Sequence, residues 1–192
     1  MEFKIENTEV YGLENAVRAS GNPMRTKIVQ PDEELTEKDY KRATKLANTG
    51  LGEGHDNYLN AVIVQFDLYA PLYMWKQIQR YHFMDFISSQ STMHCITKFN
   101  IKEQCNKYVW PQTARRLNLL VKKYNEKADK EIWKEIIANV PSGFVLGSSM
   151  TTNFRQLKTI YNQRKNHKLD EWKDFCKWIE SLPHSELITG NK

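Results

Sequence analysis

The sequence predicts a helix-rich α+β protein folded as a single domain over residues 1–192. Three observations support this prediction. Amphipathic helical stretches outnumber the short alternating runs that are typical of strands. Hydrophobic residues make up 40% of the chain and aromatic residues 11%, which is enough for a substantial core. Glycine and proline are sparse, at 8 and 6 residues, and no linker or internal repeat divides the chain.

The first part of the chain predicts one strand and two helices. Residues 2–11 fit a short strand that leads into a turn, and residues 13–20 fit a helix that a Gly-Asn-Pro sequence ends. Thr36 is a candidate N-cap with an aspartate three residues later, and an amphipathic helix follows over residues 36–46. The sequence GLGEGH at residues 50–55 breaks that helix. It lacks the spacing of a dinucleotide-binding fingerprint, so we interpret it as a turn.

A half-buried strand and a helix with two different sides come next. Residues 62–69 alternate in the way that a half-buried strand requires. Ala70-Pro71 ends this strand and can open the next helix, because proline is tolerated in the first turn. We expect that helix to continue to His82. Its apolar side carries Leu72, Trp75 and Ile78, whereas its second side is polar and aromatic and carries Tyr73, Gln77, Arg80 and Tyr81.

The second half of the chain predicts three or more helices around one further strand. Apolar stripes cover residues 110–124 and residues 128–140, with a break between the two helices at residues 125–127. Residues 144–151 alternate as a strand, and Asn153 is well suited to cap the helix that follows. A last helix ends near a proline. Four residues are predicted to lie on its core-facing side: Leu169, Trp172, Cys176 and Ile179.

The formal net charge of +5 favours an anionic partner. Phosphate groups on a small molecule satisfy that charge as well as a nucleic acid does. The lysines and arginines are scattered over several predicted helices, with only short clusters such as Arg115-Arg116 and Lys122-Lys123. We therefore expect a small anionic ligand and consider nucleic-acid binding unlikely.

The three cysteines, Cys95, Cys105 and Cys176, show neither metal-ligand spacing nor a CxxC pair. An odd number of unpaired cysteines is typical of reduced thiols in a cytosolic protein, and no metal site is expected. No signal-peptide pattern opens the chain, and no apolar run approaches the roughly 18 residues that suggest a membrane span. We therefore expect a soluble, cytoplasmic protein without a membrane partner.

Several basic residues could carry chemistry, and each has a structural alternative. His55 lies in a loop, where a histidine more often stabilises a turn than acts as a catalyst. Arg80 can offset a helix dipole, or it can bind an oxyanion together with Gln77 and the serine-rich run that follows. Arg155 and Arg164 are nine residues apart on one predicted helix and so project from opposite faces. They cannot both serve one pocket of one subunit, although one could serve a neighbour's; that both are simply solvated is an equally good interpretation.

The order of these elements resembles the flavin-dependent thymidylate synthases, the ThyX family. In that family a Gly-His loop precedes a strand, an Ala-Pro and a helix that carries Gln and then the signature Arg-His-Arg, seven residues, Ser. Gly54-His55, the strand at 62–69, Ala70-Pro71 and Gln77 appear here in that order at matching separations. Arg80-Tyr81-His82 stands where Arg-His-Arg is expected.

A second block of the sequence agrees with the same family. Family members carry a Leu-Pro, a strand ending in Thr-Val-Asn, an Arg-Ser-Leu, a second Arg nine residues after the first, and a Gln-Trp. The corresponding residues are Val140-Pro141, Thr151-Thr152-Asn153, Arg155-Gln156-Leu157, Arg164, His167 and Glu171-Trp172. Residues 16–19 also look like part of the family's first helix.

This resemblance implies a fold, a reaction and an assembly. The fold would be ThyX-like, with a central, mostly antiparallel sheet. The reaction would methylate dUMP to dTMP, or carry out related pyrimidine C5 chemistry, with FAD as cofactor and with NADPH and methylenetetrahydrofolate as co-substrates. The assembly would be a homotetramer with sites built between subunits.

The resemblance also assigns roles to individual residues. It implies catalytic roles for Arg164 and His55. It implies flavin contacts from Arg80, Tyr81, His82, Asn153 and Asn57. It implies contacts to the nucleotide substrate from Gln77, Ser89, Gln90, Ser91 and Arg155.

The chain departs from the family's pattern at the signature itself. In the ungapped register Tyr81 and His82 replace the middle His and the last Arg, and Gln90 replaces the Ser, with Ser91 next to it. A one-residue slip restores the central His and the Ser but places Tyr81 and Phe83 at the two arginines. The family's two phosphate-binding arginines fall on Ile137 and Thr92, and each lost contact is worth roughly 1.5 to 3 kcal/mol. Two hypotheses follow: a divergent enzyme, or a nucleotide- or flavin-binding protein that kept the fold and lost the reaction. A structural protein whose basic surface meets another macromolecule is a third possibility.

Overall fold

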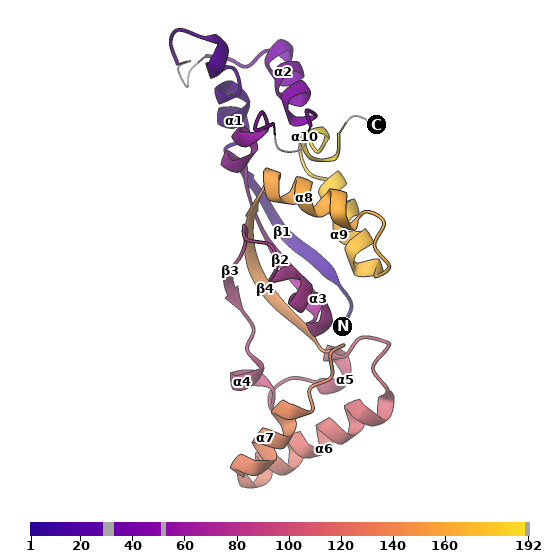
Figure 1. Ribbon diagram of the computed structural model, residues 1–192. Helices are drawn as coiled ribbons and strands as arrows, with labels where there is room; N and C mark the ends of the chain where they lie inside the picture. The colour runs from indigo at the N-terminus through magenta and orange to yellow at the C-terminus, as the bar shows by residue number, and fades with distance from the viewer. Residues whose placement is uncertain (29–32, 51–52, 191–192) are drawn as a thin grey trace. The chain divides into compact units, whose positions relative to one another are not determined.

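Four strands form one sheet in the computed structural model, which describes residues 1–28, 33–50 and 53–190. The strands are β1 (Lys4–Tyr11), β2 (Ile63–Pro71), β3 (Met84–Ser89) and β4 (Val145–Asn153), in the order β1-β2-β4-β3 (Figure 1). Hydrogen bonds show the direction of pairing, because Leu72 N donates to Phe144 O while Phe154 N donates to Val62 O. The partner's number falls as the residue number rises, which is the register of antiparallel strands.

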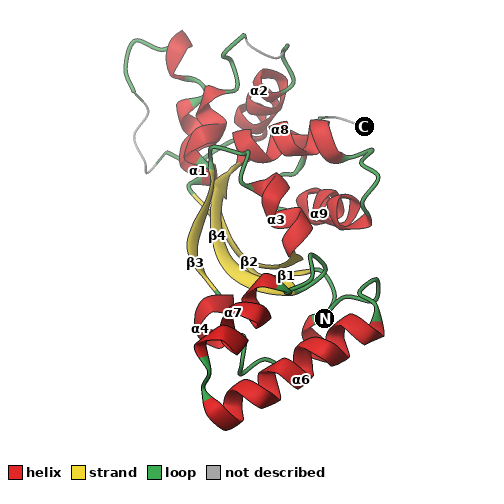
Figure 2. Cartoon of the chain, turned by 60° about the horizontal axis from the view of Figure 1, so that its bottom comes forward, coloured by secondary structure: helices red, strands yellow, loops and turns green. Residues whose placement is uncertain are grey.

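Helices make up most of the rest of the described chain, so the predicted helix-rich α+β class is confirmed (Figure 2). They are α1 (Leu13–Ala19), α2 (Glu37–Ala47), α3 (Leu72–Ile78), α4 (Thr92–Cys95), α5 (Ile101–Gln104), α6 (Pro111–Lys127), α7 (Lys130–Ala138), α8 (Phe154–Arg164), α9 (Asp170–Glu180) and α10 (Glu186–Thr189). Two short 3₁₀ segments are also present: η1 (Asn22–Met24) between α1 and α2, and η2 (Asn57–Ala61) between α2 and β2.

The chain divides into two compact units, and each draws on separate stretches of sequence. The first unit comprises Met1–Glu6, Asp67–His82 and Phe86–Met150. The second comprises Asn7–Phe66, Phe83–Asp85 and Thr151–Lys192. All four strands contribute residues to both units. The single domain expected from the sequence stays a prediction.

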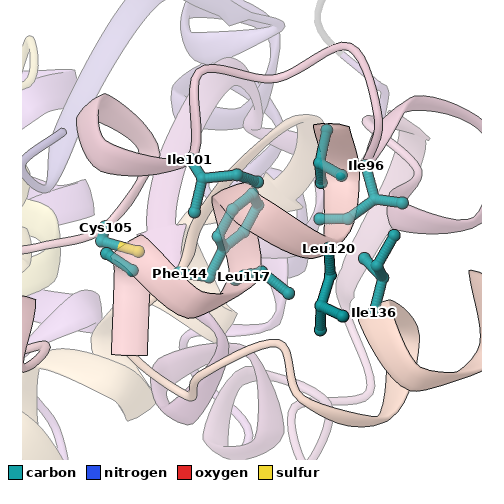
Figure 3. Packing of buried hydrophobic residues seen from close by; sticks show 9 residues of the cluster. Ile96, Ile101, Cys105, Leu117, Leu120, Ile136 and Phe144 are labelled. Atoms are coloured by element: carbon teal, nitrogen blue, oxygen red, sulfur yellow. The ribbon is translucent and has the colours of Figure 1, made fainter. Parts of the chain in front are cut away.

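The core of the first unit lies among the helices between β3 and β4. Figure 3 shows its labelled side chains together, with Ile96 from just after α4, Ile101 from α5, Leu117 from α6 and Ile136 from α7 packed near Phe144. Burying each such side chain stabilises the fold by about 1.5–3 kcal/mol. The four helices are therefore held by one shared apolar cluster.

The core of the second unit joins the sheet to α9. The ring of Phe66 on β2 lies 6.1 Å from that of Phe175 and 4.5 Å from that of Trp178, measured between centroids. Trp172 and Ile179 are fully buried on the same helix, as the apolar stripe predicts. Alternating burial along β2 confirms the half-buried strand expected at residues 62–69.

The structure corrects the prediction for the segment after α3. That helix ends at Ile78 instead of continuing to His82, so Arg80 and His82 lie in an exposed turn. The following residues, Met84–Ser89, form strand β3, which the sequence did not predict. Pairing with β4 causes this difference, because Ser148 Oγ donates to the carbonyl of residue 88 at 2.8 Å. The conformation of residues 84–89 depends on pairing with a distant strand, and the local sequence carries no information about that partner.

The break between α6 and α7 lies a few residues later than predicted. Helix α6 continues through residues 125–127 and ends at Ala128, whose φ of 49° is left-handed. Asp129 then caps α7, because its carboxylate accepts a hydrogen bond from Glu131 N at 2.7 Å. The short helices α4, α5 and α10 are absent from the prediction, since each is only one turn long.

The predicted cap of α2 is confirmed and leads to a testable pH dependence. Thr36 N and Oγ1 donate to Asp39 Oδ2 at 2.9 and 2.6 Å, and Arg42 Nη1 donates to Oδ1 at 2.7 Å. The Thr36 hydrogen bonds and the Arg42 guanidinium hold the pKa of Asp39 far below its usual value. A carboxyl whose pKa falls on folding stabilises the protein above the unfolded pKa and loses that contribution as pH falls.

We expect Asp39→Asn to lower the free energy of unfolding by about 1–2 kcal/mol at pH 7. Because the folded pKa lies below the unfolded one, the difference from wild type should shrink steadily as pH falls below about 4. Urea unfolding from pH 7 down to about pH 2.5 measures it. Glu37→Gln is the control, since that exposed side chain on the same helix pairs with exposed Lys41. A difference that stays constant over this range contradicts the assignment.

Candidate functional site

A polar hollow of about 330 Å³ lies on the sheet of the first unit. It is lined by side chains and backbone from β2, from β3 with the residue that follows it, and from β4: Asp67, Tyr69, Ser88, Ser89, Gln90, Gly147, Ser148 and Ser149. Ser149 Oγ donates to Asp67 Oδ1 at 2.5 Å, which fixes the carboxylate. The hollow therefore offers hydroxyls, amides and one carboxylate to a hydrogen-bonding ligand.

Glycine at position 147 gives this hollow its shape. A Cβ atom added there would lie 2.7 Å from Tyr69 Cε1, so any other residue would push the ring away. The absence of a side chain lets the tyrosine ring lie against β4. Neither Asp67 nor Gly147 was a site candidate in the sequence, because nothing local distinguishes a polar residue that lines a hollow from one on a solvated sheet face.

Two of the predicted substrate residues line this hollow. Ser89 and Gln90 are exposed there, and the Gln90 side chain also has a structural task. Its Oε1 accepts from Gly147 N at 2.8 Å, and its backbone N donates to Gly147 O at 2.9 Å, which extends the pairing of β3 with β4. Ser91 stands instead at the start of α4, and Gln77 lies half-buried on α3.

The predicted flavin residues at 80–82 point in different directions. Arg80 and His82 are exposed, whereas the ring of Tyr81 is 9% exposed and belongs to the core. The backbone N of Tyr81 donates to Ile78 O at 2.9 Å and so closes the end of α3. Only the outer two of these three side chains are available to a ligand.

A charged cluster occupies the second unit, at the loop that carries His55. Asp56 accepts from Lys158 Nζ, with 2.8 Å to Oδ2, and pairs with Arg155 Nε, with 3.3 Å to Oδ1. The exposed fractions of the three side chains are 13% for Asp56, 9% for Lys158 and 39% for Arg155. We call these three residues the Asp56 cluster. It brings the loop before β2 to the first turns of α8.

The other candidates near this cluster have defined surroundings. His55 is exposed, with Nε2 3.9 Å from Glu53 Oε2, and Asn57 is exposed at the start of η2. Asn153 is buried, and its Oδ1 accepts from Gln156 N at 2.8 Å. The predicted helix cap at Asn153 is therefore confirmed.

Arg164 lies at the other end of α8, against α9. Its guanidinium carbon is 4.6 Å from the centroid of the Trp172 ring, a cation–π contact that fixes the charge over an aromatic face. His167 lies nearby, and burial, with the charges of Arg164 and Lys168, lowers the pKa of its imidazole. Arg155 contacts Asp56 while Arg164 contacts Trp172, so the predicted divergence of the two arginines is confirmed.

Asp56 and Lys158 are functional candidates that sequence reasoning missed. The available signal was weak: Lys158 falls four residues after Phe154 and three before Tyr161, on the apolar stripe of α8. A cation on such a stripe predicts a buried ionic partner. The identity of that ionic partner could not be inferred, because Asp56 and Lys158 are 102 positions apart in the sequence.

The described residues contain neither a metal-ligand group nor a membrane-spanning helix. Among the described residues, no three His, Cys, Asp or Glu side chains are grouped so that they could hold a metal ion. No helix in the described ranges is long and apolar enough to cross a membrane. All three cysteines are free thiols, and burial, followed by the charge of Glu180, raises the pKa of Cys176 to about 11.

Positive charge is concentrated in one stretch of the first unit. Residues 92–144 contain ten lysines and arginines but only five acidic residues, a net charge of +5. The other residues carry eighteen of each sign and are neutral overall. Helix α6 alone has five cations and one acid. The whole formal charge of the protein therefore resides in the segment from α4 to the start of β4.

No protein-family model matches the sequence, and comparison with curated protein sequences gives no match either. Solved structures do match. A flavin-dependent thymidylate synthase ThyX from Helicobacter pylori, complexed with FAD and dUMP, superposes with a TM-score of 0.73 at 16% identity, over 98% of this chain and 97% of that chain. The protein has a ThyX-like fold. A second structure of the H. pylori ThyX with the same ligands gives 0.76 at 14% identity, again over 98% and 97%.

The ThyX-like fold also occurs in a related methylase. The UMP/dUMP methylase PolB from Streptomyces cacaoi, bound with 5-Br dUMP, gives a TM-score of 0.65 at 13% identity, over 98% of this chain and 95% of that chain. These likenesses confirm the ThyX-like fold expected from the two sequence blocks, and the antiparallel sheet of that expectation has four strands in the structure. At such identities a shared ThyX-like fold establishes architecture, and activity has to be argued from the site.

Proposed function

We propose that the protein binds a pyrimidine nucleotide and methylates its uracil ring at C5, converting dUMP to dTMP with FAD and methylenetetrahydrofolate. We further propose that it works as a homotetramer. One observation carries the proposal: the likeness to proteins crystallised with dUMP or 5-Br dUMP extends over 98% of the chain. A fold retained over its whole length keeps the elements on which a nucleotide site is built.

Each unit presents cationic donors that fit a ligand with phosphate groups. Arg155 presents a partly exposed guanidinium, and Arg80 and His82 are exposed in the first unit. Guanidinium groups bind phosphate through paired N–H donors. Arg80 and His82 of the first unit, and separately Asn57 of the second, would contact the flavin, and Arg155 of the second unit would bind the nucleotide. FAD, when bound and reduced, would supply the hydride of the reaction.

Residues of this chain would orient the pyrimidine and stabilise its developing charge. Gln77 and Ser89, with the amide of Gln90, supply donors and acceptors of the kind that a uracil edge or a ribose requires. The Arg164 guanidinium carries a positive charge and lies over the Trp172 ring, with 4.6 Å from its carbon to the ring centroid. A fixed cation of this kind would stabilise negative charge that develops on the ring. His55, also assigned to catalysis, lies exposed beside Asp56.

The alternative function is binding without turnover. Two observations favour it, both at positions of the family signature. The Tyr81 ring is buried where a histidine is expected, and the Gln90 side chain is engaged with the Gly147 backbone where a serine is expected. A protein with these features would still bind a flavin or a nucleotide through its cationic groups. It would lack part of the catalytic arrangement.

Two measurements separate these functions. The purified protein is mixed with FAD, freed of excess, and examined by visible absorption. It is then supplied with NADPH, methylenetetrahydrofolate and dUMP labelled with tritium at C5. Retained flavin with tritium release and dTMP formation supports the enzyme. Retained flavin or bound dUMP without tritium release supports the binding protein. If the protein binds neither flavin nor dUMP, both proposed functions are contradicted.

A further inference from the structure

The Asp56 cluster carries one more positive charge than negative charge. It contains one carboxylate, one ammonium and one guanidinium, which gives a net charge of +1. The side chain of Lys158 is buried, and its ammonium group donates hydrogen bonds to Asp56 and to the carbonyl of Ala47, the latter at 2.5 Å. Burying an ammonium ion costs several kcal/mol unless it is paired in this way. The lysine is therefore committed to the cluster.

The two oxygens of Asp56 are shared between the two cations. Oδ2 accepts from Lys158 Nζ at 2.8 Å, and Oδ1 pairs with Arg155 Nε at 3.3 Å. Arginine has five N–H donors, of which only the one on Nε faces Asp56 here. The 39% exposed side chain thus keeps its two terminal nitrogens for another partner. Among the described residues, no second carboxylate pairs with Arg155.

We propose that Lys158 is a positioning residue for an anion site at Arg155, an inference that rests on the proposed nucleotide-binding function. Lys158 occupies one carboxylate oxygen and so prevents the guanidinium from closing onto both. It also leaves the cluster with the single positive charge that a phosphate group of the ligand neutralises. Asp56 orients Arg155, Lys158 limits the strength of that pairing, and the ligand completes the network.

This arrangement makes a specific prediction for Lys158→Met. Without the ammonium, Asp56 has only Arg155 as a partner, and the pair becomes neutral. The guanidinium closes onto the carboxylate in the bidentate geometry that arginine prefers. Affinity for a phosphate-containing ligand should fall about 10- to 100-fold, because a charge-assisted hydrogen bond is lost.

The double variant Asp56→Asn with Lys158→Met distinguishes positioning from a structural role. Removing both charges returns the cluster to +1, carried by Arg155 alone, and releases the guanidinium from its carboxylate. Phosphate affinity should recover most of what the single variant lost. If the cluster only supported the fold, the double variant, which lacks more native contacts, would bind no better than the single one.

Calorimetry with matched ligands identifies which phosphate is bound. The pairs are FAD against riboflavin and dUMP against deoxyuridine, and inorganic pyrophosphate serves as a ligand with no ring. Lys158→Met should weaken binding of the phosphate-bearing member of one pair and leave the other member unchanged. The pair affected tells whether the flavin or the substrate occupies the site. Lys165→Met is the control, because Lys165 is an exposed cation at the end of the same helix.

Folding of each variant is checked by its thermal transition. If Lys158→Met does not fold, the double variant and Arg155→Gln still test the proposal: the first should bind pyrophosphate and the second should not. Equal phosphate-ligand affinities in wild type and Lys158→Met overturn the proposal. So does a double variant that binds the ligand more weakly than Lys158→Met. A wild-type protein that binds no phosphate ligand also overturns it. Pyrophosphate affinity should be lower in Lys158→Met than in wild type and should recover in the double variant. If this order is observed while dUMP is not methylated, the proposed enzymatic activity is wrong and the anion site at Arg155 is supported.

Discussion

Replacement of Phe144 by alanine should lower the free energy of unfolding by about 3–5 kcal/mol. The ring is fully buried in the first unit and meets Phe99 edge to face, with 5.7 Å between centroids. It lies where β4 begins and where the helices of the first unit meet the sheet, since its carbonyl accepts from Leu72 N at 3.1 Å. Truncation leaves a cavity among groups held by several elements, so the site cannot collapse. Urea unfolding at pH 7 measures the loss.

Leu119→Ala is the matched control for Phe144→Ala. Leu119 belongs to the same unit, but its side chain is 58% exposed on α6. Its truncation should change stability by no more than about 0.5 kcal/mol. Comparable losses in the two variants would contradict the placement of the core.

Replacement of Arg164 by glutamine should lower turnover of dUMP about 10²- to 10³-fold, if the proposed reaction is correct. The guanidinium is oriented by the Trp172 ring and would stabilise charge that develops only during the reaction. Binding of the unreacted nucleotide should change much less, because the neutral ring offers little to this cation. Tritium release from C5 reports turnover, and calorimetry reports binding of dUMP.

Arg116→Gln is the control for Arg164→Gln. Arg116 has a side chain that is 81% exposed and only a loose ion pair, 3.7 Å to Glu135. The Arg116→Gln substitution removes the same charge as Arg164→Gln and should leave turnover of dUMP unchanged. Equal losses in turnover and in dUMP affinity for Arg164→Gln would assign this arginine to binding. Unchanged turnover would remove it from the mechanism.

Features that depend on neighbours in sequence could be predicted well. The alternation at residues 62–69 identified β2 because one face of that strand is buried and the other is not. Thr36 and Asn153 were recognised as caps because their hydrogen bonds close within three residues. Such interactions are nearly complete in the local sequence.

Features that depend on distant partners could not be predicted. Strand β3 exists because β4 pairs with it, and the serines in it read as a loop when that partner is unknown. The same limit applies to the site. Donors such as Gln90 were identified by type, but the structure shows that its amide also binds the backbone of Gly147. The Asp56 cluster joins residues 102 positions apart, and no local pattern specifies that distance.

The concentration of charge in residues 92–144 gives the molecule an electrostatic polarity. Because the other residues balance, an anion in solution is attracted toward one part of the chain instead of toward the protein as a whole. Added salt shortens the reach of this field to about 8 Å at physiological ionic strength. Encounter rates with anionic molecules will therefore depend on ionic strength, even for ligands whose final binding does not involve α6.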